Sequence, residues 1–185
     1  SQNIKIPFVD LYPQYEELQS EIDLAIRDII ARSDFITGPT VEKLEKAICK
    51  YTGAEDCASI GSGTNALVCA LKALGIQAGH QVMTVGHTFV STTEAIVNVG
   101  ATPVFVDVDP RTYNIDIDKI AAKITDKTKA IIIVHLFGRC VDMDALKAVI
   151  PEHIKIVEDA ACASGADWKG QPAGSLGDVA AFSFH

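Results

Sequence analysis

The sequence lacks an excess of basic residues and a long apolar run. It has 16 Lys and Arg against 24 Asp and Glu, a formal net charge of -8, which argues against nucleic acid as the main partner. No run approaches the roughly 20 apolar residues of a transmembrane helix, so we expect no membrane partner. Residues 1–5 read Ser-Gln-Asn-Ile-Lys and do not match a signal peptide.

Paired cysteines and clustered histidines are also missing. The five cysteines are odd in number, and none is spaced as in CxxC or zinc-finger motifs. We therefore expect no disulfide framework and a reducing, cytoplasmic location. The five histidines are dispersed, without an HxxxH pair, and we predict no metal site.

What the chain does contain is a regular alternation of apolar strands and helices. Two amphipathic helices come first, one from Pro13 and one after Gly38-Pro39, and residues 1–12 before them are expected to be extended. Helices are then predicted at 63–74, 89–99, 116–123 and 142–149, between strands at 55–60, 80–85, 103–107, 130–135, 154–158 and 179–184. We predict a helical segment, residues 1–53, and an α/β domain, residues 54–185, with a three-layer, doubly wound, mostly parallel sheet.

In folds of this kind, ligands bind at the carboxyl ends of the parallel strands. Those ends are therefore where a ligand site should form. The predicted ends are Gly61 to Asn65, Gly86 to Phe89, Asp107 to Asp109, His135, Asp159 and Ser183 to His185.

The turn Gly61-Ser62-Gly63-Thr64-Asn65 stands between a predicted strand and a predicted helix. Free backbone N–H groups and hydroxyls at a helix start can hold a phosphate, although an ordinary helix N-cap would look the same. The stretch also fits the dinucleotide pattern GxGxxA. That alternative requires an acid at the end of the next strand, and Thr84 to Thr88 contain none, so it is disfavoured.

Asp159 follows the apolar strand 154–158. A carboxylate at this position can hold a protonated pyridine nitrogen and keep the ring an electron sink; a loop cap is the simpler alternative. Glu158 should point to the opposite face of the strand, which favours Asp159. Pyridoxal 5′-phosphate carries both a phosphate and a pyridine nitrogen, and so would fit the turn and the carboxylate together.

Other strand ends supply further candidates. Phe89 could stack on a flat cofactor ring or equally be a core residue. His87 and His135 are expected either to be structural or to support the residues that contact the ligand, because neither has a nearby acid that marks a triad. Ser183 alternates with two phenylalanines, and if these face the core, its hydroxyl faces the ligand.

With these residues in view, the chain resembles the sugar aminotransferases of the DegT/DnrJ/EryC1/StrS family, fold type I enzymes that use pyridoxal phosphate. The resemblance runs through essentially the whole chain, and it is the order and spacing of several strings that make it specific. They are IPFVDL at 6–11, FITGP at 35–39, GSGTNAL at 61–67, HTFVSTTEAI at 87–96, GATPVFVDVDPRTYNID at 100–116, VHLFG at 134–138, VEDAACASGA at 157–166 and GDVAAFSFH at 177–185.

The resemblance implies a role for each matching position. Phe89 would stack on the pyridine ring, Asp159 would pair with its nitrogen, and Ser183 would lie near the phosphate. Cys162 stands where the family often has glutamine or histidine, a departure to which we assign no role. The residues of the phosphate-binding turn would be Ser62, Gly63, Thr64 and Asn65.

The resemblance also implies that one catalytic group is missing. The family's cofactor-binding lysine would lie about three residues past His185, and a C-terminal small domain would follow. The expected reaction is amino transfer, with glutamate as donor, to a dTDP-, UDP- or GDP-linked keto sugar, as part of polysaccharide or natural-product biosynthesis. A homodimer with shared active sites is expected, with the N-terminal helices and residues 35–39 at its interface. The rival readings are a sugar dehydratase, a non-catalytic regulatory relative and, least favoured, a dehydrogenase.

Overall fold

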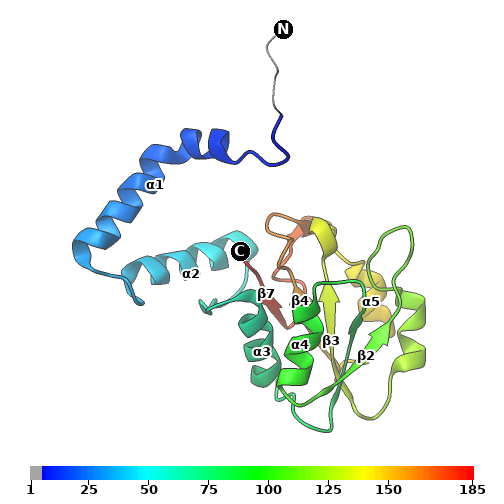
Figure 1. The fold of residues 1–185 in the computed structure, drawn as a ribbon. Helices are drawn as coiled ribbons and strands as arrows, with labels where there is room; N and C mark the ends of the chain where they lie inside the picture. Colours follow the sequence, from blue (N-terminus) through cyan, green and yellow to red (C-terminus); the bar gives the residue numbers. More distant parts are fainter. Residues whose placement is uncertain (1–5) are drawn as a thin grey trace. The chain divides into compact units, whose positions relative to one another are not determined.

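A computed structural model describes residues 6–185. The chain falls into two compact units, one ending at Leu44 and one running from Glu45 to His185. The first unit contains α1 (Tyr12–Arg32) and the start of α2 (Pro39–Thr52) (Figure 1). Residues 6–11 form no helix or strand, whereas the rest of the predicted extended segment lies outside the described residues. The predicted domain boundary at residue 53 stays a prediction.

Five parallel strands form the sheet of the second unit. They are β1 (Gln81–Val85), β2 (Thr102–Val106), β3 (Thr128–Val134), β4 (Lys155–Asp159) and β7 (Val179–Ala181). Their order is β2-β1-β3-β4-β7, and every neighbouring pair is parallel. Because parallel strands need crossover connections, each of β1 to β4 is followed by a segment that crosses one face of the sheet.

Helices cover both faces of this sheet, which confirms the predicted three-layer, doubly wound fold (Figure 1). Alternate residues of β3 show the layering: Ile132 packs in a core with α3 (Gly63–Ala73) and α4 (Val90–Asn98). Ile131 and Ile133 pack in a second core with α5 (Met143–Val149). All three isoleucines are fully buried, as expected of a strand covered on both faces.

Three sequence predictions need correction. Residues 55–60 form no strand, because they have no hydrogen-bonded neighbour strand among the described residues. Residues 116–123 form two 3₁₀ turns, Ile117–Lys119 and Ala121–Lys123, instead of an α-helix. Ile117 and buried Ile120 are three residues apart, a spacing that suits a 3₁₀ turn. Phe184 is 71% exposed and does not face the core.

Two short strands were not predicted. β5 (Asp167–Trp168) and β6 (Gln171–Pro172) form an antiparallel hairpin between β4 and β7. The turn between them includes Lys169 and Gly170, both with positive φ. Within residues 6–185, every helix is too short or too polar to cross a membrane.

Candidate functional site

The turn before α3 has the geometry of a capped helix start. Ser62 is extended and its hydroxyl accepts a hydrogen bond from the Asn65 N–H at 3.2 Å. The first N–H groups of a helix have no acceptor within it, so the start of α3 presents donors toward the turn. This is an arrangement that can bind an anion such as a phosphate.

Gly63 lies against Ser183, which follows β7. A β-carbon placed on Gly63 would stand 3.0 Å from the Ser183 Cβ and 3.3 Å from its Oγ. A larger residue at position 63 would therefore force the helix start and the serine a few tenths of an ångström apart. Two candidates that are 120 positions apart in the sequence, at 63 and 183, are thereby brought into contact.

The first turn of α4 connects this turn to the end of β4. Thr64 Oγ1 donates to Ser91 Oγ at 2.8 Å. The next residue, Thr92, is fully buried and donates from Oγ1 to Asp159 Oδ2, also at 2.8 Å. Two consecutive residues of one helix thus hold the proposed phosphate turn and the proposed ring-nitrogen partner.

Asp159 ends β4 with only 7% of its surface exposed. Besides Thr92, its carboxylate accepts one hydrogen bond, from the Ala161 N–H to Oδ1 at 3.3 Å. No ion pair joins it to a cation among residues 6–185. A buried carboxylate without a counter-ion is costly unless a cation arrives from elsewhere, so this side chain can still take a cationic ligand.

Glu158, the preceding residue, has a full set of hydrogen-bond partners, in contrast to Asp159. It lies fully buried on the other face of β4 and pairs with His135 Nε2 at 3.0 Å. Because His135 Nδ1 accepts from the Val141 N–H, its Nε2 carries the proton that is donated to Glu158. The Glu158 carboxylate also accepts three backbone hydrogen bonds at 2.7–2.8 Å, from Gly174, Leu176 and Gly177.

These contacts explain the titration of Glu158. Burial raises its pKa, but the hydrogen bonds from His135, Gly174 and Gly177 outweigh that effect and hold the pKa below its ordinary 4.5. The hydrogen-bonding capacity of Glu158 is used within the fold, so Glu158 and His135 are structural, which is one of the two roles predicted for His135. The prediction that Glu158 and Asp159 face opposite ways is also confirmed.

Phe89 and Cys162 are both solvent-accessible. Phe89 stands immediately before α4 with 75% of its surface exposed, which excludes the alternative of a core phenylalanine within this chain. Its ring is available for stacking on a flat ligand. Cys162, three residues past Asp159, is exposed as well.

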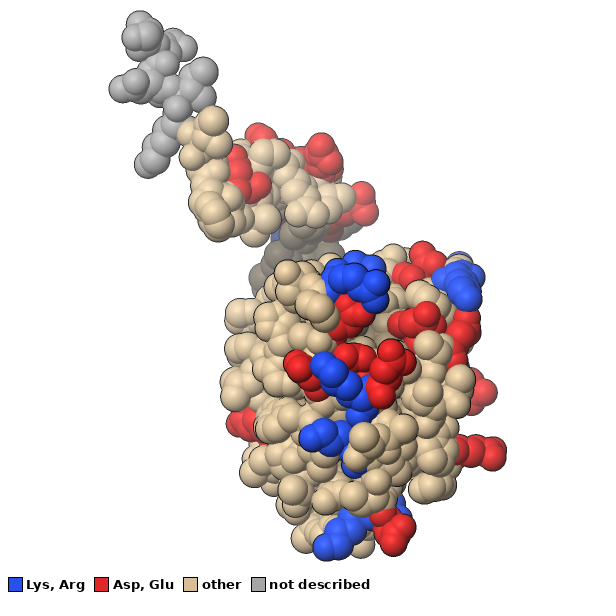
Figure 2. All heavy atoms as spheres, turned by 90° about the vertical axis from the view of Figure 1, so that its right-hand side faces the viewer, with Lys and Arg blue, Asp and Glu red and all other residues tan. Residues whose placement is uncertain are grey.

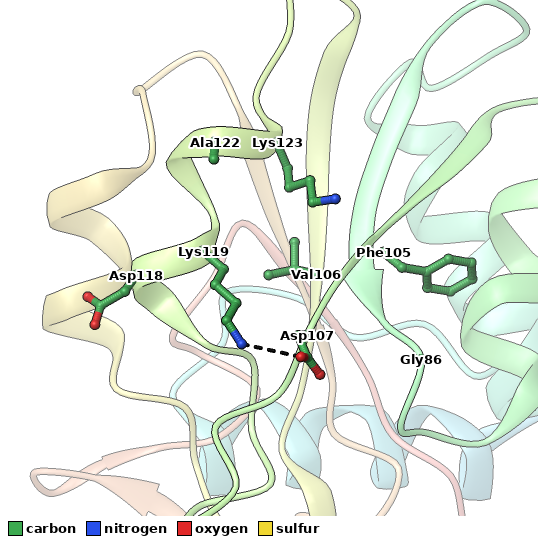
Figure 3. Close-up of a pocket in the computed structure, with 8 residues that line it drawn as sticks. All are labelled: Gly86, Phe105, Val106, Asp107, Asp118, Lys119, Ala122 and Lys123. Atoms are coloured by element: carbon green, nitrogen blue, oxygen red, sulfur yellow. Dashed lines mark hydrogen bonds and ion pairs between the residues drawn. The ribbon is translucent and has the colours of Figure 1, made fainter.

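A cavity of about 620 Å³ lies elsewhere, beside the edge strand β2 (Figure 3). Lys119, which projects into it, is already paired with Asp107 at 3.2 Å and with Asp116 at 3.0 Å. Figure 2 shows acidic and basic side chains intermingled on this side of the molecule. None of the predicted cofactor residues is among its lining residues, which are Gly86, Phe105, Val106, Asp107, Asp118, Lys119, Ala122 and Lys123.

Sequence reasoning missed the hydroxyl residues of α4. Thr88 Oγ1 lies 3.0 Å from Thr92 Oγ1, and Thr92 in turn binds Asp159. Thr88 precedes both the predicted helix and α4, whose N-cap is Phe89, so helical periodicity did not connect the two threonines. The carboxylate partner, 67 positions away, was not readable from the local sequence either.

The residues present fit pyridoxal phosphate in three respects. The α3 turn with Ser183 offers donors to an anion, Asp159 offers an unpaired buried carboxylate to a cation, and Phe89 offers an exposed ring. Among residues 6–185, no three His, Cys, Asp or Glu side chains come together in a way that could hold a metal ion.

Known proteins are similar to this chain along nearly all of its length. The model of the DegT/DnrJ/EryC1/StrS aminotransferase family matches residues 16–185. A pleiotropic regulatory protein of Geobacillus stearothermophilus is 43% identical over 182 residues, covering 98% of this chain and 49% of that protein. The UDP-2-acetamido-2-deoxy-3-oxo-D-glucuronate aminotransferase of Pseudomonas aeruginosa is 42% identical over 180 residues, covering 97% of this chain and 50% of that protein.

A solved structure agrees with the fold. S. venezuelae DesV, in complex with a ketimine intermediate, matches with a TM-score of 0.93 at 38% identity, covering 98% of this chain and 49% of DesV. The chain spans about half the length of the curated relatives it matches.

Proposed function

Because the chain belongs to the DegT/DnrJ/EryC1/StrS aminotransferase family, we propose that it forms the cofactor-binding part of a sugar-nucleotide aminotransferase that uses pyridoxal phosphate. The intact protein would move an amino group, with glutamate as donor, to a dTDP-, UDP- or GDP-linked keto sugar. It would work in the cytoplasm as a homodimer and serve polysaccharide or natural-product biosynthesis.

The observation that carries this proposal is the contrast between two neighbouring carboxylates. Glu158 accepts hydrogen bonds from a histidine and three backbone amides, whereas Asp159 has one hydroxyl, one longer amide contact and no cation among residues 6–185. A fold keeps a buried, unpaired carboxylate at a strand end when a ligand supplies the missing charge. A protonated pyridine nitrogen supplies it here.

Each predicted site residue has a distinct role in this proposal. When bound, pyridoxal phosphate supplies an electron-accepting ring for chemistry at the amino-bearing carbon. Asp159 accepts the N–H of the ring nitrogen and keeps that proton in place. Phe89 covers one face of the ring. The phosphate is held by Ser62, Gly63, Thr64, Asn65 and Ser183.

In the family, a lysine that follows a motif like FSFH binds the cofactor covalently, and none of the lysines in residues 1–185 stands in that motif. We propose that this lysine lies just beyond position 185 of the intact protein, where the family motif that FSFH at 182–185 begins would continue. The residues described here would then bind and orient the cofactor, and the lysine would move protons at the reacting carbon.

A regulatory protein is the second candidate, favoured by the similarity to the Geobacillus protein. Such a protein would bind the cofactor through the same residues without turning over a sugar nucleotide. A dehydratase would instead carry histidine at the position of the lysine.

These alternatives separate in one experiment on the intact protein. It is loaded with pyridoxal phosphate, reduced with borohydride and mapped by peptide mass spectrometry, and a second sample is given glutamate and keto sugar nucleotides. An adduct on a lysine just past His185, together with an amino sugar product, supports the aminotransferase. An adduct without product supports the regulatory protein, and bound cofactor without any adduct supports the dehydratase.

A further inference from the structure

The Asp159 carboxylate is held by a directed chain of hydroxyl groups. Thr92 has one hydroxyl proton and donates it to Asp159 Oδ2 at 2.8 Å. The Thr92 oxygen can therefore only accept from Thr88, whose Oγ1 lies 3.0 Å away. Hydrogen bonds that run in one direction polarise one another, so both threonines act on the carboxylate.

We propose that Thr92 is a positioning residue that sets the orientation and hydrogen bonding of Asp159 toward the cofactor's ring nitrogen; this inference rests on the proposed function. Thr92 is fully buried and Asp159 is nearly so, so water does not substitute for the hydroxyl. The hydrogen bond from Thr92 engages Oδ2 of the Asp159 carboxylate from the side of α4. The free lone pairs of that carboxylate remain available to the ligand.

The choice of a hydroxyl has a chemical reason. A lysine or arginine at position 92 would also orient the carboxylate, but it would neutralise the charge that has to stabilise a cationic ring. A threonine orients the carboxylate through a dipole and leaves the negative charge in place. The side chain is also stiff, because its β-carbon is branched.

The hydrogen bond between Thr64 and Ser91 adds to the positioning role of Thr92. Ser91 accepts the hydroxyl of Thr64 in the proposed phosphate turn, and Thr92 is the next residue of α4. The two ends of the cofactor bed are thus tied to adjacent positions of one helix. Thr92 thereby sets where Asp159 lies relative to the phosphate turn.

The test compares T92V, which keeps the shape and removes the hydroxyl, with T92S, which keeps the hydroxyl. Each intact protein is loaded with pyridoxal phosphate carrying heavy nitrogen in its ring, and the nitrogen chemical shift is followed through a pH titration. In T92V we expect ring deprotonation to begin about 1 pH unit lower and the cofactor dissociation constant to rise about tenfold. T92S should behave as the wild type does in both measurements.

The outcomes separate this inference from the proposed function. If the wild type binds no cofactor, or binds it with an unprotonated ring nitrogen, the proposed function fails. If the wild type binds a protonated ring and T92V titrates identically, Thr92 is not a positioning residue and only this inference fails. A merely structural role would lower the thermal midpoint of the cofactor-free T92V protein without moving the nitrogen titration of the molecules that remain folded, and that result would also overturn the inference.

Discussion

At the scale of single residues, the close approach of Gly63 to Ser183 is the tightest constraint on the proposed phosphate site. A methyl group at position 63 would stand 3.0 Å from the Ser183 Cβ, whereas one at Gly61 would meet only the Asn65 side-chain nitrogen at 4.0 Å. An alanine should therefore be tolerated at position 61 but not at position 63, and the two variants can be compared.

For G63A, we expect unfolding free energy to fall by about 1–3 kcal/mol, as for other overpacked sites, with weaker binding of pyridoxal phosphate. G61A is the matched control and should bind as the wild type does. The measurements are urea unfolding and cofactor titration of the intact protein. In the double variant G63A/S183G the lost stability should return, because the colliding β-carbon is gone. Equal behaviour of G63A and G61A would contradict this account of the turn.

At the scale of elements, the buried pair of Glu158 and His135 fastens the segment before β7 to the end of β4. Three backbone amides between Gly174 and Gly177 donate to the one carboxylate. β7 leads directly to Ser183, so this contact on one face of the sheet helps position a residue of the proposed site.

Protection of these amides should depend on pH. The folded-state pKa of Glu158 lies below its ordinary 4.5, so the unfolded state binds the proton more readily. The stabilisation is complete above pH 4.5 and is lost as the pH falls through the folded-state pKa. Hydrogen exchange of the Gly174, Leu176 and Gly177 amides should quicken in that range beyond the intrinsic change.

Removing the negative charge of Glu158 by mutation should also speed amide exchange at Gly174, Leu176 and Gly177, and it should do so at neutral pH. E158Q replaces one accepting oxygen by an amide nitrogen and so leaves buried N–H donors without an acceptor. We expect it to cost about 1–3 kcal/mol and to expose those three amides to exchange. E152Q, at an exposed position, is the control and should leave their protection unchanged. Unaltered exchange in E158Q would show that the segment is held by other contacts.

The elements also show how far the sequence could be read. Strand β3 was predictable because its central residues are apolar on both faces, as Ile131, Ile132 and Ile133 show. Residues 55–60 were misassigned, since strand formation depends on a neighbour strand that a local pattern does not reveal. The roles of Thr92 and Glu158 were hidden for the same reason, because their partners lie 67 and 23 positions away.

At the scale of the whole molecule, the described part of the N-terminal unit, residues 6–44, carries exposed apolar side chains. Leu18, Ile22, Ile26 and Ile30 recur at helical spacing on α1 and are 37–56% exposed. A stripe of this kind on a long helix is typical of a surface that packs against another helix or subunit. It agrees with the proposed homodimer.

The substitution I22D therefore tests the dimer proposal. A charge in the middle of the stripe should shift the intact protein from dimer to monomer in analytical ultracentrifugation, because burying an unpaired carboxylate is unfavourable. The control is E21Q, which alters the charge of a neighbouring exposed residue and should leave the mass unchanged. If I22D sediments as the wild type does, α1 is not the dimer interface.

The central claim is that Asp159 holds the ring nitrogen of pyridoxal phosphate, and its most direct test is cofactor binding by D159N. Asparagine keeps the size of the side chain and removes the charge that a protonated ring requires. We predict that D159N of the intact protein binds the cofactor about a hundredfold more weakly than the wild type, whereas D144N, at a surface ion pair with Lys169, binds it normally. Equally tight binding by D159N and the wild type would contradict the account.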